Sequence, residues 1–286
     1  MGNVGFKVIN PYHKNIPITI RQLATHTSSI NDEGNYNKAY IFEEELDKKE
    51  FPEAWGKYID MYNKNTPMEM KDFLEKVFKE GGDWETKKNF IEAKPGTKYE
   101  YSNIGASLLA YCTQLSVGKN YMDFTKELIL EPLKMENSGW SLKEVDSKNH
   151  ISYYNEIYNI VLPYYCVTYP DGNLYSSVHD LTKFMQEMMK GYEGNSSMLT
   201  AESFQEMMKN QIPELDVPTG IIWDMDNTCS IGHGGNDFGI ATMMFFDPDT
   251  GIGKILFTNV STEKEEQEQQ FYSIFVNIFK YDSGIK

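Results

Sequence analysis

The sequence has 286 residues, of which 40% are hydrophobic and 14% are aromatic, which is enough for one large core or two modest ones. Its formal net charge is −15 and Arg21 is its single arginine, which argues against a surface that binds nucleic acid phosphates. The apolar runs are too short to span a membrane, and the first residues lack the basic and apolar regions of a signal peptide. These features therefore do not assign the protein to a cellular compartment.

Apolar residues at helical spacing predict helices through the first three quarters of the chain. Thr19 is a candidate N-cap of the first helix, and Gly118 is a candidate C-terminal stop of the most apolar one. Residues 139–175 are rich in Tyr, Asn, Gly and Pro and predict an irregular crossing with short strands. The helices are expected from residue 20 and over 38–49, 67–80, 104–116, 121–130, 177–190 and 200–210.

After Pro218 the pattern changes to short runs of β-branched and aromatic residues. These runs predict antiparallel strands within 219–225, 228–235, 238–246 and 253–260, the last two joined by the turn sequence DPDTG. A final helix, 263–280, is expected to cover one face of this sheet with an apolar stripe of Phe271, Ile274, Phe275, Ile278 and Phe279. The prediction is one α+β domain over 1–286, with a mainly helical subdomain at 20–212 and an antiparallel sheet plus C-terminal helix at 213–286.

The cysteines do not indicate a disulfide framework or a metal site. Cys112, Cys166 and Cys229 are far apart and odd in number, which favours buried free thiols. Asp224, Asp226 and Asn227 in WDMDN have calcium-ligand chemistry, but no glycine and distal glutamate complete a loop, so a solvated strand connection is the preferred interpretation. We expect neither a metal nor a cofactor.

The stretch KYEYSNIGASLLAY, which contains Tyr101, Ser102 and Asn103, supports two interpretations. Ser102 or Asn103 can accept a hydrogen bond from the first free amides of the following helix, so the triplet works as a cap. The same triplet can also belong to a catalytic site, although a motif this short is weak support by itself.

Distant segments read together favour the catalytic interpretation. The segments ITIRQLATHTSSI, KPGTKYEYSNIGASLLAY, YPDGNLYSSVHDLTKFM and IGHGGNDFGIATMMFFDPDTGIGKILFTN occur in this order. The set resembles the β-lactamase and penicillin-binding-protein-like serine hydrolase superfamily, in its class C β-lactamase, DD-peptidase and esterase branch. This resemblance implies a helical subdomain against an antiparallel sheet. It also implies acyl transfer by a Ser-x-x-Lys nucleophile pair, a Tyr-x-Asn motif and a Lys-Thr-Gly or His-x-Gly strand.

The resemblance assigns roles residue by residue. Tyr101 matches the tyrosine base and Asn103 the amide that positions substrate. His233 matches the histidine of the His-x-Gly strand and is expected to be catalytic, with Gly234 and Gly235 after it as expected substrate-binding residues. The N–H of the next residue, Asn236, matches one oxyanion donor. Ser102 stands between the two motif residues and is not the family nucleophile, and His26 is expected to be a structural turn residue.

The nucleophile pair is not found at its expected place. The family places Ser-x-x-Lys before the segment matching ITIRQLATHTSSI, and no serine precedes that segment here. Three such strings occur elsewhere, at 116–119, 261–264 and 283–286, and none has the helix-start context that the chemistry needs. We therefore expect that the N-terminal part of the fold, with its first helix and strands, is absent from this chain.

Two functional hypotheses follow. The first is a serine hydrolase domain for a D-alanyl peptide, a β-lactam or a small ester, inactive in this form because its nucleophile is absent. The alternative is a non-catalytic binder of cell-wall fragments, or a structural module, on the same fold. The expected ligand is a small-molecule or peptidoglycan-like substrate, and a homo-oligomer can form through an exposed sheet edge.

Overall fold

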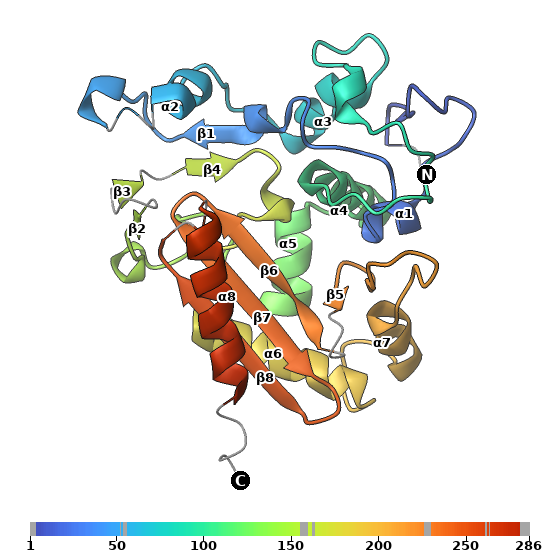
Figure 1. The fold of residues 1–286 in the computed structure, drawn as a ribbon, viewed down its shortest axis with the longest axis vertical. Helices are drawn as coiled ribbons and strands as arrows, with labels where there is room; N and C mark the ends of the chain where they lie inside the picture. The colour runs from blue at the N-terminus through green and yellow to red at the C-terminus, as the bar shows by residue number, and fades with distance from the viewer. Residues whose placement is uncertain are drawn as a thin grey trace.

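The structure, a computed structural model, describes residues 4–51, 53, 56–154, 160–161, 164–225, 230–260, 262 and 264–280. A four-stranded antiparallel sheet forms one half of the molecule (Figure 1). Its strands, in spatial order, are β5 (Asp224–Met225), β6 (Ile231–Asp237), β7 (Ile240–Asp247) and β8 (Ile252–Thr258). The predicted meander is confirmed for its last three strands.

Helices cover both faces of this sheet (Figure 1). Successive side chains along β7 point to opposite faces, so each helical layer meets a different set of them. Met243 and Phe245 face α8 (Glu265–Lys280), where they pack with Phe271 and Phe275. On the other face, Met244 and Phe246 form a second core with side chains from α6 (Val178–Tyr192) and α7 (Ala201–Met208). Two separate apolar layers therefore hold the sheet in place.

The other half of the molecule is mainly helical. Its core surrounds α4 (Asn103–Val117), whose buried Ile104 and Leu108 pack with Phe73 and Leu74 of α3 (Met70–Phe78). Two short antiparallel pairs lie beside these helices, β1 with β4 and β2 with β3. The elements are α1 (Ile20–Ala24), β1 (Tyr40–Phe42), α2 (Gly56–Tyr62), α3 (Met70–Phe78), α4 (Asn103–Val117), α5 (Tyr121–Thr125), β2 (Tyr153–Tyr154), β3 (Ile160–Val161) and β4 (Tyr164–Cys166).

Several predicted helix ends are confirmed by their caps. Thr19 accepts a hydrogen bond from the Gln22 amide at the start of α1, and the Gln22 side chain accepts one from the Thr19 amide, which completes a capping box. Gly118 ends α4 with a φ of 68°, in the left-handed region that glycine adopts without strain. Ser177 and Thr200 cap α6 and α7.

The helix predicted at 38–49 is wrong. Its first half instead forms strand β1, where Ile41 is buried and pairs with Tyr165 of β4. The charged residues after it form a loop and one short 3-10 turn, 48–50. Charged composition favours a helix locally, but pairing with a segment more than one hundred residues away determines the structure here.

Two further expectations need correction. The strand predicted at 219–225 is reduced to β5, because the Ile221 and Ile222 amides donate to the carbonyls of Met207 and Ala24 instead of to a strand. In the predicted stripe of α8, Phe271 and Phe275 are buried, but Ile274 and Ile278 are exposed. The stripe is therefore narrower than its sequence suggests, and the Phe279 side chain lies outside the described residues.

Candidate active site

A cavity of about 1080 Å³ lies between the two halves of the molecule. The start of α4 contributes Tyr101 and Asn103 to its wall, and β6 contributes the segment 233–237. The predicted site residues Tyr101, Asn103, His233, Gly234, Gly235 and Asn236 thus all line one cavity, although more than one hundred and twenty positions separate the two groups in the sequence. Residues 145–178 supply much of the remaining wall.

The N-terminus of α4 is anchored by a carboxylate that the sequence analysis did not identify. Ser102 is the N-cap, and its Oγ accepts a hydrogen bond from the Gly105 amide (3.0 Å) and donates one to Asp32 (2.8 Å). Asp32 also accepts hydrogen bonds from the backbone amides of Asn103 (2.8 Å) and Ile104 (3.1 Å). A negative charge at a helix N-terminus is favourable, so this contact locks the position of the Tyr-Ser-Asn triplet.

Tyr101 lies between two histidines. Its ring centroid is 4.4 Å from that of His26 and 6.1 Å from that of His233. Burial raises the pKa of Tyr101 well above its usual range, and the carboxyls of Asp171 and Asp224 raise this pKa further. The phenol is therefore protonated at neutral pH, since no nearby cation stabilises a tyrosinate in the described part of the cavity wall.

His26 belongs to the site geometry, although its sequence context indicates only a turn. It has a φ of 51°, and its Nδ1 accepts a hydrogen bond from the Ser102 amide at 3.3 Å. Burial lowers the pKa of His26 to about 4, and the nearby His233 lowers it further. A neutral imidazole is therefore fixed against the Tyr101 ring.

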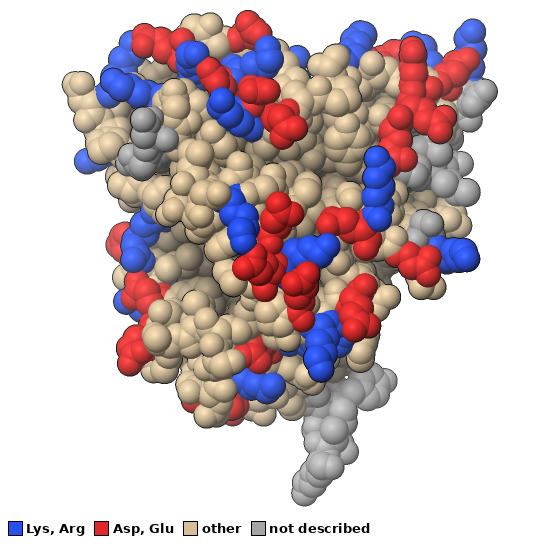
Figure 2. Space-filling view, turned by 180° about the vertical axis from the view of Figure 1, so that it is seen from behind, with Lys and Arg blue, Asp and Glu red and all other residues tan. Residues whose placement is uncertain are grey.

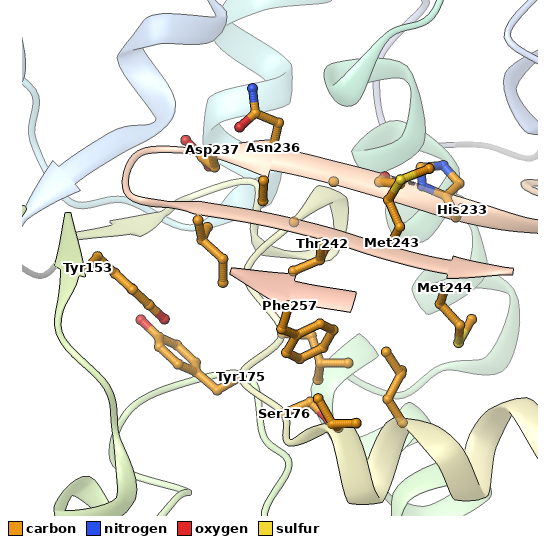
Figure 3. A pocket seen from close by; sticks show the side chains of 18 of the residues that line it. Tyr153, Tyr175, Ser176, His233, Asn236, Asp237, Thr242, Met243, Met244 and Phe257 are labelled. Carbon is orange, nitrogen blue, oxygen red and sulfur yellow. Dashed lines mark hydrogen bonds between the residues drawn. The ribbon is translucent and has the colours of Figure 1, made fainter. Parts of the chain in front are cut away.

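The β6 strand aligns the remaining predicted residues along one wall (Figure 3). His233 pairs with Met244 in the sheet register, and its Nδ1–H donates to the Gly234 carbonyl at 2.5 Å. Because a carbonyl oxygen can only accept, this contact places a proton on Nδ1. Gly235 and Asn236 are exposed, and the Asn236 side chain accepts a hydrogen bond from the Thr262 amide (3.3 Å).

Two further carboxyls line the cavity without any motif to indicate them. Asp171 accepts a hydrogen bond from Ser107 Oγ (2.9 Å), and burial raises its pKa to about 8. Asp237 accepts one from the Tyr40 hydroxyl (3.4 Å), and burial raises its pKa to about 6. In the sequence, Asp171 stands in a Pro-Asp-Gly turn pattern that gives no sign of burial.

The described residues do not place a Ser-x-x-Lys pair in the cavity. Ser116 lies in the last turn of α4, and Lys119 pairs with Glu127 on the surface. The lining serines are Ser176 and Ser177; the first contacts Ser138 Oγ and the second caps α6. Ser261 and the string at 283–286 lie outside the described residues.

No metal-binding group of histidine, cysteine and carboxylate side chains forms among the described residues. Asp224 lies in β5, whereas Asp226, Asn227 and Cys229 are outside the described residues. Cys112 and Cys166 are free thiols, and burial raises the pKa of each. No described helix has the length and apolar character needed to cross a bilayer.

The family of the chain follows from a comparison against protein families. A family model described as Beta-lactamase matches residues 9–276. The chain belongs to the β-lactamase family. This membership confirms the resemblance stated from the four sequence segments, and the fold is the β-lactamase/transpeptidase-like α+β fold.

Solved structures with the same fold include a penicillin-binding protein, a penicillin-binding protein homologue and an amidase. The octameric penicillin-binding protein homologue from Pyrococcus abyssi superposes with a TM-score of 0.65 at 21% identity over 96% of this chain and 58% of its own. The penicillin-binding protein from Bacillus halodurans has a TM-score of 0.61 at 19% identity, covering 95% of this chain and 76% of its own. D-amino acid amidase from Ochrobactrum anthropi SV3 has a TM-score of 0.65 at 18% identity, covering 95% and 74%.

These identities establish the shared fold and not a shared substrate. The chain spans little more than half the length of the Pyrococcus protein, and about three quarters of the other two. A search of curated protein sequences found no match.

Proposed function

We propose that this chain forms the substrate-binding and proton-transfer side of a serine acyl-transfer site that acts on an amide or an ester. In this assignment Tyr101 is the proton-transfer residue of the site and Asn103 positions the substrate. The β6 segment of residues 233–236 lies beside the acyl group of the substrate. The Asn236 N–H provides one oxyanion donor. The single observation that carries the proposal is the shared cavity, which receives these residues from α4 and β6.

We further propose that the 286-residue chain binds such a substrate without being acylated by it. Acyl transfer needs a serine beside a base, and the serines that line the cavity are engaged with Ser138 and with the start of α6. The raised pKa of Tyr101 supports the same conclusion, because a protonated phenol cannot remove a proton from a hydroxyl. The substrate therefore binds in the cavity but forms no covalent bond with the chain.

A labelling experiment tests the covalent part. The chain is incubated with a fluorophosphonate and with a fluorescent penicillin, and its intact mass is measured alongside Tyr101→Phe. We expect no adduct on either protein. An adduct on the wild-type chain that is lost in Tyr101→Phe would overturn this part, because it would require a working nucleophile next to Tyr101.

A calorimetric titration tests the binding part. N-acetyl-leucine amide is a neutral amide, and we expect it to bind the wild-type chain and to lose at least about tenfold in affinity in His233→Ala. Asn195→Ala is the matched control, because this exposed residue lies outside the cavity. Its side chain contacts Glu193, and alanine keeps the backbone hydrogen bond to the Lys190 carbonyl. Equal affinity in His233→Ala and in the control would show that the ligand does not bind at this cavity and would contradict the proposal.

A non-catalytic binder of cell-wall fragments is the second candidate, favoured by a formed cavity that holds no nucleophile pair among the described residues. Titration with an acyl-D-Ala-D-Ala peptide separates the two, because a specialised binder is stabilised by this ligand and its melting temperature rises. An unchanged melting temperature would rule out the binding of cell-wall fragments.

A further inference from the structure

The charged residues that line the cavity all have the same sign. Its acidic lining residues are Asp146, Asp171, Asp224, Asp237 and Glu268. No lysine or arginine lines it among the described residues, and none of these carboxyls forms an ion pair with a described lysine or arginine. The described cavity lining is therefore acidic, whereas on the face of the molecule in Figure 2 basic side chains lie among the acidic ones.

Two of these carboxyls are held in place by hydroxyl donors. Asp171 is bound by Ser107 Oγ and Asp237 by the Tyr40 hydroxyl. Figure 3 shows Asp237 on β6 next to Asn236, at the end of the strand that also carries His233. A ligand that reaches the β6 wall therefore meets a fixed acidic side chain close to the proposed substrate-binding residues.

Tyrosine side chains form another part of the cavity wall. Tyr36, Tyr40, Tyr153 and Tyr175 line the cavity, and Figure 3 shows the phenol ends of Tyr153 and Tyr175 pointing toward one another. Aromatic faces attract organic cations, and carboxylates add to this attraction in a partly desolvated space. A carboxylate ligand meets the reverse situation, because it would lose water and gain no cationic partner from the described wall.

We infer that the ligand of this cavity is an amide or ester that carries an ammonium group and no free carboxylate. The inference rests on the proposed function, since it names the charge of the substrate for that same site. A bound cation would also offset the carboxyls of Asp171 and Asp224, which raise the pKa of Tyr101. The substrate would thus place a positive charge near Tyr101, which has no lysine or arginine beside it in the described cavity wall.

Three ligands of similar size test the inference by calorimetry at pH 7.5. The amide of N,N,N-trimethyl-leucine carries a permanent positive charge, N-acetyl-leucine amide is neutral, and N-acetyl-leucine is an anion. We expect the cation to bind at least about tenfold more tightly than the neutral amide, and the anion not to bind measurably. An anion that binds as tightly as the cation would overturn the inference.

Charge-removing substitutions locate the effect. Asp237→Asn and Asp224→Asn should each reduce the preference for the cation by about fivefold or more, while the neutral amide keeps its affinity. Asp249→Asn is the control, because this exposed aspartate lies in the β7–β8 turn outside the cavity. A cation preference that survives both cavity variants would place the charge recognition elsewhere and contradict the inference.

The same titrations separate failure of the inference from failure of the proposed function. If the neutral amide does not bind at all, the proposed amide or ester site is wrong. If the neutral amide binds in a His233-dependent way and the cation binds no better, the site stands and only its charge preference is refuted.

Discussion

Asp32 binds both ends of Asn103: its Oδ2 accepts a hydrogen bond from the Asn103 backbone amide (2.8 Å) and another from the Asn103 side-chain Nδ2 (3.0 Å). One carboxylate thereby fixes the helix start and the amide that the site presents to a substrate. The proposed positioning role of Asn103 consequently depends on a residue 71 positions earlier in the chain, in a loop after α1.

The first prediction concerns Asp32→Asn. Asparagine has one acceptor oxygen in place of two, so it cannot accept all of the hydrogen bonds that Asp32 receives from Ser102, Asn103 and Ile104. We expect the free energy of unfolding in urea to fall by about 2 kcal/mol. Glu33→Gln is the control, because this neighbouring carboxylate is exposed and should cost about 0.5 kcal/mol or less. Equal losses in the two variants would show that Asp32 has no special role.

The second prediction concerns the pH dependence that His26 imposes. Burial lowers its pKa from 6.5 to about 4, so the unfolded chain binds a proton in this range more readily than the folded one does. Stability from this residue is therefore present above pH 6.5 and is lost as the pH falls toward 4, by up to about 3 kcal/mol. Urea unfolding between pH 7 and 4.5 measures the slope.

His26→Asn supplies the comparison for that slope. Asparagine tolerates the positive φ at this position and keeps an acceptor for the Ser102 amide, but it does not titrate. The pH dependence of the free energy of unfolding should be shallower in this variant by the amount that His26 contributes. Parallel curves for the two proteins would mean that His26 does not cause the effect.

The third prediction uses two glycines two positions apart on β6. A Cβ at Gly232 would lie 2.1 Å from the Met244 carbonyl oxygen, so alanine there must displace β6 from β7. We expect Gly232→Ala to lower the free energy of unfolding by about 3 kcal/mol and to weaken ligand binding by moving His233. At Gly234 the nearest atom would be 3.7 Å away, which is ordinary contact, so Gly234→Ala should cost about 0.5 kcal/mol or less. A reversed order of the two costs would refute this account of strand packing.

The fourth prediction concerns self-association, which we propose for the sheet edge and the helix beside it. In the described sheet β8 is an edge strand, and the adjacent α8 exposes Tyr272, Ile274 and Val276. Unpaired strand edges and exposed apolar faces favour contact with a second copy. Sedimentation velocity from 1 to about 100 µM is expected to show a dimer that grows with concentration.

Charged substitutions check where this contact forms. Ile274→Lys should shift the dimer to at least about tenfold higher concentration, whereas Leu199→Lys, at an equally exposed apolar position before α7, should leave it unchanged. A protein that stays monomeric over the whole range would dismiss the proposal.

Local sequence patterns predicted the elements whose folding depends on neighbours in the chain. The caps at Thr19, Ser177 and Thr200 form hydrogen bonds within three residues, so such caps can be recognised from the sequence alone. The alternation along β7 and the DPDTG turn are equally local. The segment 38–49 failed as a helix because Ile41 gains more from pairing with β4 than its charged neighbours gain from helix formation.

The sequence by itself determined the family of this protein and the identity of Tyr101, Asn103 and the His233 strand as site candidates, because those residues stand in motifs of short, fixed spacing. Only the tertiary structure brought these motifs to one cavity, added Asp171 and Asp237 to its wall, and placed Asp32 against Asn103. These carboxyls stand in loops, at the end of a strand and in turns that resemble ordinary solvent-exposed positions. Their role comes from burial and from partners distant in the chain, and neither property is encoded in any local pattern.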